Sequence, residues 1–406
     1  MTTPDVYLIT IDCLRPDYVG AFNRLARMTP TIDGLMSGGT IISQCVSHAP
    51  FTTPSIASLM TGHYPPDTGV RLLLGQLCNE SLPTIAQLAK RAGYTTAGFP
   101  SAFILNSDTG LQRGFDLYRD IDDGVASTRG GCWQPCAPIH DAFERFLTDA
   151  GRDPVFCWLH YFDLHDYHLD KSLPHAASYA RDVYEKVDQQ CMRGLLSIIE
   201  RHRSVDNAAF VITADHGECL YQHGQRGHGW HVYDSVIRVP LAISWPGKVA
   251  KESANHHLAR HIDLLPTLAK LWGVDMPTPT PGVDLFEHTD RSDNVSYAEA
   301  SPRQLFEGDA TARKTFTGPE MQSIRNERYK YIRHEDGGTE LYDLMLDPHE
   351  HHDRSSMQPD ALAAMASRLD ALLASTGNAS RTRTMETEHE SAAVRERLHA
   401  LGYIHE

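Results

Sequence analysis

Short apolar runs alternate with amphipathic helical patterns along the first two thirds of the chain. An apolar run at 6–11 comes first, and helical patterns then precede apolar runs in three places: 81–92 before 94–99, 140–148 before 155–161, and 179–201 before 209–213. Further segments predict a helix at 29–36 and a strand at 41–47. A helix-then-strand rhythm of this kind predicts an α/β fold with a mostly parallel central sheet and helices on both faces.

The last third of the chain has a different pattern. A Pro/Thr-rich segment at 277–281 is a candidate linker, and short strand patterns follow at 294–300, 321–326, 329–334 and 339–344. Asp336-Gly337-Gly338 suits a hairpin turn between the last two strands, and an amphipathic helix is predicted at 359–374. We therefore expect a large α/β domain over 1–290, a small α+β subdomain over 291–376, and a linker with a helical tail over 377–406.

Composition narrows the class of protein and of partner. The chain has 406 residues, of which 41% are hydrophobic and 22% charged, as in ordinary globular proteins. A formal charge of −15 argues against a nucleic-acid polymer as partner, although a small anionic ester substrate stays compatible with it. No apolar stretch approaches the length of a membrane span, and association into a homo-oligomer stays open.

The cysteines and the N-terminus bear on location. The apolar run at 6–11 is too short for a signal peptide, and the eight cysteines lack zinc-finger spacing. Cys132 and Cys136 are spaced so that they could form a metal or redox pair. Free thiols in a reducing compartment account better for the whole set, which predicts a cytoplasmic protein.

The segment 50–62 predicts a loop that turns directly into a helix. Thr52 and Thr53 offer hydroxyls there, and Pro54 suits the first helical turn. A helix N-terminus attracts anions, and a hydroxyl at that place becomes a nucleophile if a metal or a base lowers its pKa. The alternative is an ordinary threonine cap before an amphipathic helix.

Acidic residues follow two of the predicted strands. The run at 6–11 ends at Asp12, and the run at 209–214 ends at Asp215 and His216. Ligands of open α/β sheets collect at the carboxyl ends of the strands, so these side chains and Thr52 predict a metal-and-anion site.

An ordered set of motifs resembles the sulfatase branch of the alkaline phosphatase superfamily. The matching segments run through the chain in family order: 12–17, 52–62, 160–165, 215–218, 227–229, 233–234, 238–240, 262–267, 340–344 and 347–348. The resemblance implies an alkaline-phosphatase-like three-layer sandwich with a small C-terminal α+β subdomain.

The resemblance also implies roles for individual residues. Asp12, Asp215 and His216 match the family's metal ligands, and Thr52 matches the nucleophile that also touches the metal. We expect a divalent ion, which could be manganese, zinc or calcium, in one or two copies.

Histidines decide between one metal ion and two. Asp163, His165 and His228 could form a second site. Alternatively, His165 and His228 bind the substrate's oxyanion or protonate the leaving group, with a pKa near neutrality. Arg15 either clamps an anionic oxygen of the substrate or pairs with Asp17. The other histidines of these regions are expected to be structural or exposed: His160, His168, His223 and His231.

Three positions depart from the family pattern. Sulfatases carry a cysteine or serine, converted to formylglycine, where this chain has Thr52, and an arginine where it has Ile56. Many carry a metal-binding aspartate where it has Cys13. Because oxidation of threonine cannot give an aldehyde, the departures favour phosphorus over sulfur as the reacting centre.

The sequence therefore predicts a metal-dependent hydrolase of a phosphate ester, phosphodiester or phosphonate monoester that uses Thr52 as nucleophile. The alternatives are a sulfate-ester hydrolase with an unmodified threonine, and a transferase that passes a phospho group to an acceptor alcohol. An inactive binding protein is disfavoured because Asp12, Thr52, Asp215 and His216 are all present. Substrate choice is expected to reside in loops such as 120–138 and 301–320.

Overall fold

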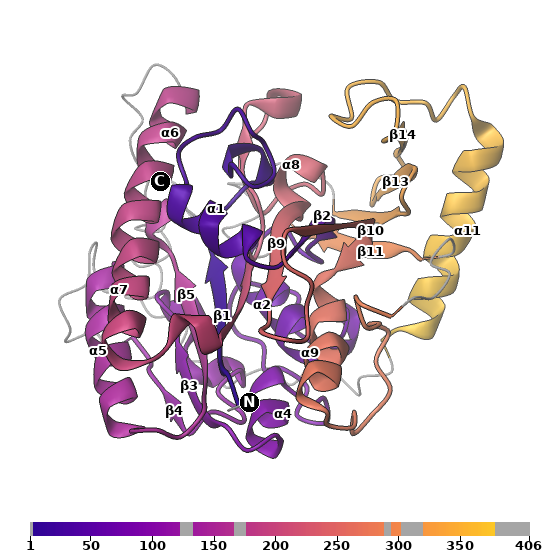
Figure 1. Cartoon of the computed structure of the whole chain (residues 1–406). Coiled ribbons are helices and arrows are strands. Elements are labelled where there is room, and N and C mark those ends of the chain that lie inside the picture. The colour runs from indigo at the N-terminus through magenta and orange to yellow at the C-terminus, as the bar shows by residue number, and fades with distance from the viewer. Residues whose placement is uncertain (1–2, 122–132, 166–175, 288–293, 302–319, 378–406) are drawn as a thin grey trace, which may run out of the picture.

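An eight-stranded sheet forms the centre of the protein (Figure 1). The computed structural model describes residues 3–121, 133–165, 176–287, 294–301 and 320–377. In spatial order the strands are β10 (Ser253–Arg260), β2 (Thr40–Val46), β9 (Arg238–Ser244), β6 (Ala208–Thr213), β1 (Asp5–Ile11), β5 (Val155–Tyr161), β3 (Thr95–Phe99) and β4 (Leu117–Tyr118).

The first strand of the chain lies in the middle of this sheet. β1 pairs in parallel with β5 on one side and with β6 on the other, and all its residues are buried. β9 runs antiparallel to β2 and β6, whereas the other neighbouring pairs are parallel. The predicted mostly parallel sheet is confirmed.

Helices cover both faces of the sheet, which lies between the two groups in Figure 1. One group contains α1 (Pro30–Ser37), α5 (Cys136–Asp149), α6 (Ala176–Lys186) and α7 (Arg193–His202). The other contains α2 (Thr52–Thr61), α4 (Ile85–Arg91) and α9 (Leu264–Trp272). Shorter elements are α3 (Pro65–Thr68), α8 (Asp234–Ile237), β7 (Cys219–Leu220) and β8 (Arg226–Gly227).

The sequence predictions for the segments 179–201 and 120–138 are wrong in detail. The helix expected over 179–201 is interrupted by a π-helical segment, Val187–Met192, between α6 and α7. The loop expected over 120–138 ends earlier, because α5 already begins at Cys136; residues 122–132 lie outside the described part of the chain.

A second, antiparallel sheet follows near the C-terminus. It contains β11 (Ser296–Ala300), β12 (Met321–Arg325), β13 (Tyr329–His334) and β14 (Thr339–Asp343) in that order. α11 (Pro359–Ser375) packs on β12 and β13 through the buried side chains of Met365 and Leu369. The antiparallel sheet and helix confirm the predicted α+β subdomain.

Other C-terminal expectations are not tested. The predicted tail helix lies within 378–406 and most of the loop 301–320 within 302–319, outside the described residues. The domain boundaries stay predictions. Among the described residues, no helix combines the length and the apolar character needed to cross a membrane.

Candidate active site

Two buried aspartates lie side by side at the carboxyl edge of the sheet. Asp12 follows β1 and Asp215 follows β6, and the two strands are paired in parallel with Thr10 opposite Thr213. Both carboxylates are fully buried. The register thus brings together two residues that are about 200 positions apart in the chain, as the sequence predicts.

Thr52 begins helix α2 beside these carboxylates. Its hydroxyl donates to Asp12 Oδ2 at 3.0 Å and lies 3.3 Å from His216 Nε2. The N-cap of α2 is Phe51, which makes no side-chain capping bond, so Thr52 does not act as an ordinary threonine cap. The hydroxyl is therefore available to the site, at the positive end of the helix dipole.

The far end of α2 depends on a glycine. Gly62 has a φ of 70°, and a Cβ there would lie 2.9 Å from Leu265 Cδ2. Glycine alone provides this left-handed cap without strain or a clash, so it sets where α2 ends against α9.

His216 presents an unprotonated nitrogen to Thr52. Its Nδ1 donates to the Gly217 carbonyl at 2.8 Å, which leaves Nε2 with its lone pair facing Thr52. Nε2 also lies 3.4 Å from Asp215 Oδ2. Burial lowers the pKa of His216 to about 4, so the ring is neutral near pH 7 and can accept a proton or bind a metal ion.

The donor set fits a divalent cation. One ligand atom each of Asp12, His160 and Asp215 lies within 4.8 Å of the others. Asp12 Oδ1, Asp215 Oδ2 and His160 Nε2 are buried and have no hydrogen-bond partner among the described residues. Burial and the neighbouring Asp215 charge raise the pKa of Asp12. A cation would offset this cost of holding two carboxylates together away from water.

The predicted metal ligands Asp12, Thr52, Asp215 and His216 are thus brought together, and His160 joins them. The sequence predicts that His160 is structural or exposed. The signal that could have found it is its position near the end of β5, next to β1, where it pairs with Thr10.

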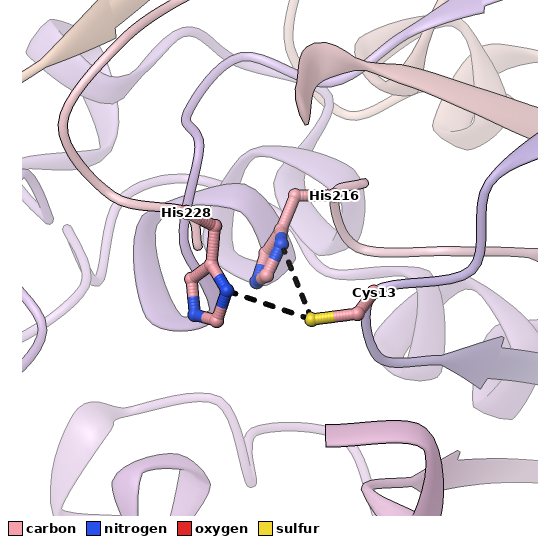
Figure 2. Close-up of side chains that lie close together, drawn as sticks. All are labelled: Cys13, His216 and His228. Atoms are coloured by element: carbon pink, nitrogen blue, oxygen red, sulfur yellow. Dashed lines mark hydrogen bonds between the residues drawn. The ribbon is translucent and has the colours of Figure 1, made fainter. Parts of the chain in front are cut away.

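Cys13 connects this group to a second cluster (Figure 2). Its backbone is left-handed, with a φ of 59°, and its sulfur lies 4.0 Å from His216 Nδ1 and 3.6 Å from His228 Nδ1. The thiol also donates to Glu218 Oε2 at 3.4 Å. Burial and the nearby carboxylates Asp12 and Glu218 raise the pKa of Cys13, so it is a neutral thiol near pH 7.

His228 and His165 lie together beside this thiol. His228 Nδ1 is 2.8 Å from Glu218 Oε2, and the rings of His228 and His165 are 5.1 Å apart. The ring of His165 stacks on that of Phe162, with 4.2 Å between the ring centroids. One ligand atom of His165 also lies within 4.8 Å of one ligand atom each of Asp12 and Cys13. The expected pKa near neutrality is wrong for His228, because burial lowers its pKa to about 4.

Asp163 does not join His165 and His228. Its Oδ1 accepts the backbone N–H of Cys136 at 3.1 Å, which holds the carboxylate at the start of α5. Instead, a ligand atom of Asp163 lies within 4.8 Å of one ligand atom each of Cys136 and Cys191. The predicted second metal site of Asp163, His165 and His228 is therefore not formed among the described residues.

Two contacts were predicted for Arg15, one with a substrate oxygen and one with Asp17, and the structure shows the pair with Asp17. Its guanidinium pairs with Asp17 at 2.7 Å and donates to the Glu218 carbonyl at 2.7 Å and to Gln222 Oε1 at 3.1 Å. These bonds place Arg15 behind Glu218, where it supports the backbone that carries that carboxylate.

Comparison with known protein families gives two matches. The family described as Sulfatase matches residues 4–274. The family described as N-sulphoglucosamine sulphohydrolase, C-terminal, matches residues 226–376. Between them they extend over both sheets.

Characterised relatives and solved structures agree with these matches. A Delta 4,5-hexuronate-2-O-sulfatase of Bacteroides thetaiotaomicron is 24% identical over 407 residues, covering 86% of this chain and 83% of the relative. Human arylsulfatase A is 26% identical over 344 residues, covering 70% of this chain and 67% of the relative. The structure of a 2-O GAG sulfatase superposes with a TM-score of 0.75 at 20% identity, covering 98% and 96% of the two chains.

A phosphonate monoester hydrolase of Agrobacterium radiobacter shares the fold as well, with a TM-score of 0.71 at 19% identity over 92% of this chain and 96% of that one. The relatives matched by sequence, however, are named for sulfate esters. The prediction of phosphorus as the reacting centre, which depended on Thr52, is contradicted by these matches.

Proposed function

This chain belongs to the sulfatase family of metal-dependent hydrolases, and on that premise we propose that it hydrolyses sulfate esters with Thr52 as the nucleophile. The observation that carries the proposal is the position of the Thr52 hydroxyl, 3.0 Å from Asp12 Oδ2 and 3.3 Å from His216 Nε2. Sulfated sugars are the proposed substrate class, since a hexuronate-2-O-sulfatase and an ulvan-active sulfatase are among the relatives.

The proposed reaction has two displacements. The Thr52 proton passes to His216 Nε2 or to Asp12 Oδ2, the two groups within reach of the hydroxyl. Thr52 Oγ1 then bonds to sulfur while the bond from sulfur to the ester oxygen breaks, and the departing alkoxide takes a proton from His165. Water next gives a proton to His165 and attacks sulfur while the bond from sulfur to Thr52 Oγ1 breaks. Hydrogen sulfate leaves, and Thr52 Oγ1 takes its proton back from His216 or Asp12.

Asp12, Asp215 and His160 or His216 would hold the divalent cation, which supplies positive charge that polarises the sulfate oxygens and favours the deprotonated threonine. Calcium is the proposed ion because most of these donors are oxygens, with manganese and zinc as the competitors to test.

The first test measures sulfate release by ion chromatography. The substrates are p-nitrophenyl sulfate and a panel of sulfated monosaccharides, and the enzyme is stripped of metal and then reloaded with calcium, manganese or zinc. We expect turnover that is lost on stripping and restored by one of these ions. No sulfate release from any ester with any of the ions would contradict the proposal.

The second test addresses the nucleophile. Thr52→Ala should lower kcat/KM at least about a thousandfold, and acid-quenched wild-type enzyme should contain a sulfated peptide that includes Thr52. Ser58→Ala is a matched control, because Ser58 lies in the same helix and its buried hydroxyl has no partner among the described residues. Full turnover by Thr52→Ala would remove Thr52 from the mechanism.

The cysteines support a reducing compartment as the site of this activity. Cys13, Cys45, Cys78, Cys136, Cys157, Cys191 and Cys219 are all buried free thiols. Oxidising compartments favour disulfides, so we propose a cytoplasmic location.

A further inference from the structure

A second group of potential metal ligands lies outside the proposed catalytic residues. Cys136 is the first residue of α5, Asp163 follows β5, and Cys191 belongs to the π-helical segment Val187–Met192. One ligand atom from each lies within 4.8 Å of the others. All three side chains are buried, with exposed fractions of 6%, 7% and 0%.

Asp163 has a carboxylate oxygen that is placed to bind a metal ion. Its Oδ1 accepts the Cys136 N–H at 3.1 Å, but its Oδ2 has no hydrogen-bond partner among the described residues. A buried carboxylate oxygen without a partner costs free energy that a cation would recover.

We propose that Cys136, Asp163 and Cys191 bind a zinc ion. Two thiolates exclude the hard cations calcium and magnesium, and the carboxylate disfavours copper(I), whereas zinc accepts both sulfur and carboxylate oxygen. Tetrahedral zinc requires about 3.8 Å between two sulfur ligands, so groups already within 4.8 Å need small movements. Two thiol protons leave on binding, and water takes the fourth position.

A disulfide between Cys136 and Cys191 is the competing use of the two thiols. It would leave Asp163 Oδ2 as it is, buried and without a partner among the described residues. Zinc uses all three side chains, and the structure therefore favours zinc.

The site would join three elements next to the catalytic residues. Asp163 is two positions before His165, Cys136 starts α5, and Cys191 lies where the helix pattern changes between α6 and α7. Bound zinc would hold the segment that carries His165 against these helices, a structural role that does not depend on the chemistry proposed above.

Metal content tests the proposal directly. The protein is purified without chelators, dialysed against zinc and then against buffer, and zinc is counted by mass spectrometry. Wild type should retain one zinc more per chain than Cys191→Ser or Asp163→Asn. Cys219→Ser, which replaces a buried cysteine outside the cluster, and Asp215→Asn, which disrupts the catalytic metal ligands, should retain that zinc. Equal zinc in wild type and Cys191→Ser would overturn the site.

Two further readouts do not use variants of the cluster itself. Zinc should protect Cys136 and Cys191 of the wild-type protein from alkylation, as mapped by peptide mass spectrometry. Cobalt(II) should give a thiolate charge-transfer band in the near ultraviolet that persists in Cys13→Ser. A Cys136–Cys191 disulfide in protein purified without reductant, or alkylation unaffected by zinc, would refute the proposal.

Discussion

Glu218 is buried behind His228 and controls the orientation of that ring. Its Oε2 lies 2.8 Å from His228 Nδ1 and accepts the Cys13 thiol at 3.4 Å. Since a carboxylate accepts, the hydrogen of the neutral His228 ring is on Nδ1, and Nε2 has the lone pair. Carboxylates that orient a histidine ring in this way commonly affect activity about as much as the ring itself does.

Replacing Glu218 by glutamine should therefore lower activity without unfolding the protein. An amide can present either its oxygen or its NH₂ to His228, so the ring orientation is less strictly held. We expect kcat/KM for a sulfate ester to fall by about 10- to 100-fold, mainly through kcat.

Glu327→Gln is the matched control for this variant, because Glu327 also pairs with a histidine, His257, at 3.0 Å, but at an exposed position. Its activity should equal that of wild type. Comparable losses in the two variants would indicate a general effect of removing a charge.

The roles of individual residues are the part of the site that the sequence predicts least well. Asp12, Asp215 and His216 follow recognisable strands, so their meeting could be predicted from topology alone. Glu218 and His160 could not be assigned, because the direction of a side chain near or beyond a strand end depends on the local backbone and on neighbouring strands. Cys13 shows the same limit, since nothing in the sequence indicates its left-handed backbone.

Among the elements, the π-helical segment Val187–Met192 supports the start of helix α1. It directs the buried carboxylate of Asp188 to the start of α1, where it accepts the N–H groups of Thr31 at 3.1 Å and Ile32 at 2.8 Å. These are two of the donors that a helix start leaves without an internal partner.

Asp188→Ala should destabilise the protein by about 2 kcal/mol, because two buried N–H groups lose their acceptor. Urea unfolding would measure the change. Glu200→Ala, at an exposed position of α7, should change stability by less than about 0.5 kcal/mol. An equally small change for Asp188→Ala would show that water replaces the carboxylate.

Elements with local signals were predicted well. Gly93 ends α4 with a φ of 90°, and Gly337 supplies the left-handed residue of the hairpin between β13 and β14. The π-helical insertion carries no such signal, because the apolar spacing continues through it. The sequence pattern predicts too late a start for α5 because Pro138 suggests a loop, although proline is tolerated in a first helical turn.

At the scale of the whole molecule, a buried charge network connects the two sheets. Asp234 in α8, which precedes β9 of the large sheet, pairs with Arg325 of β12 at 2.6 Å and with Lys330 of β13 at 2.8 Å. Glu350 completes the network by pairing with Lys330 at 2.6 Å and accepting the Asp234 N–H at 2.7 Å. Burial opposes ionisation of Asp234, but Arg325 and Lys330 outweigh it and hold the pKa of Asp234 below its usual value.

Asp234→Asn should lower the free energy of unfolding by at least about 3 kcal/mol, since buried Arg325 loses its counter-charge and Lys330 loses one of its two. Thermal and chemical unfolding would measure it. The control is Asp370→Asn, whose partner is Arg333 and whose side chain is 66% exposed, with an expected change below about 1 kcal/mol. Equal effects of the two variants would mean that the network is not a stabilising link.

The reacting atom was the one whole-molecule property that the sequence argument assigned wrongly. Sulfate and phosphate esters both present tetrahedral oxyanions, so a cation and a helix N-terminus serve either of them. Threonine in place of the usual cysteine at position 52 determines which nucleophile is present. It does not determine whether that nucleophile attacks sulfur or phosphorus.

The central place of β1 has a consequence for synthesis on the ribosome. Its partners β5 and β6 are made about 150 and 200 residues later, which at bacterial to eukaryotic elongation rates of 5–20 residues per second delays the completed pairing by about 10 to 40 s. Throughout that interval the nascent chain exposes a strand whose residues are all buried in the finished protein. Early binding of the N-terminal segment by a holdase chaperone would therefore protect the chain from aggregation while it waits for its neighbours.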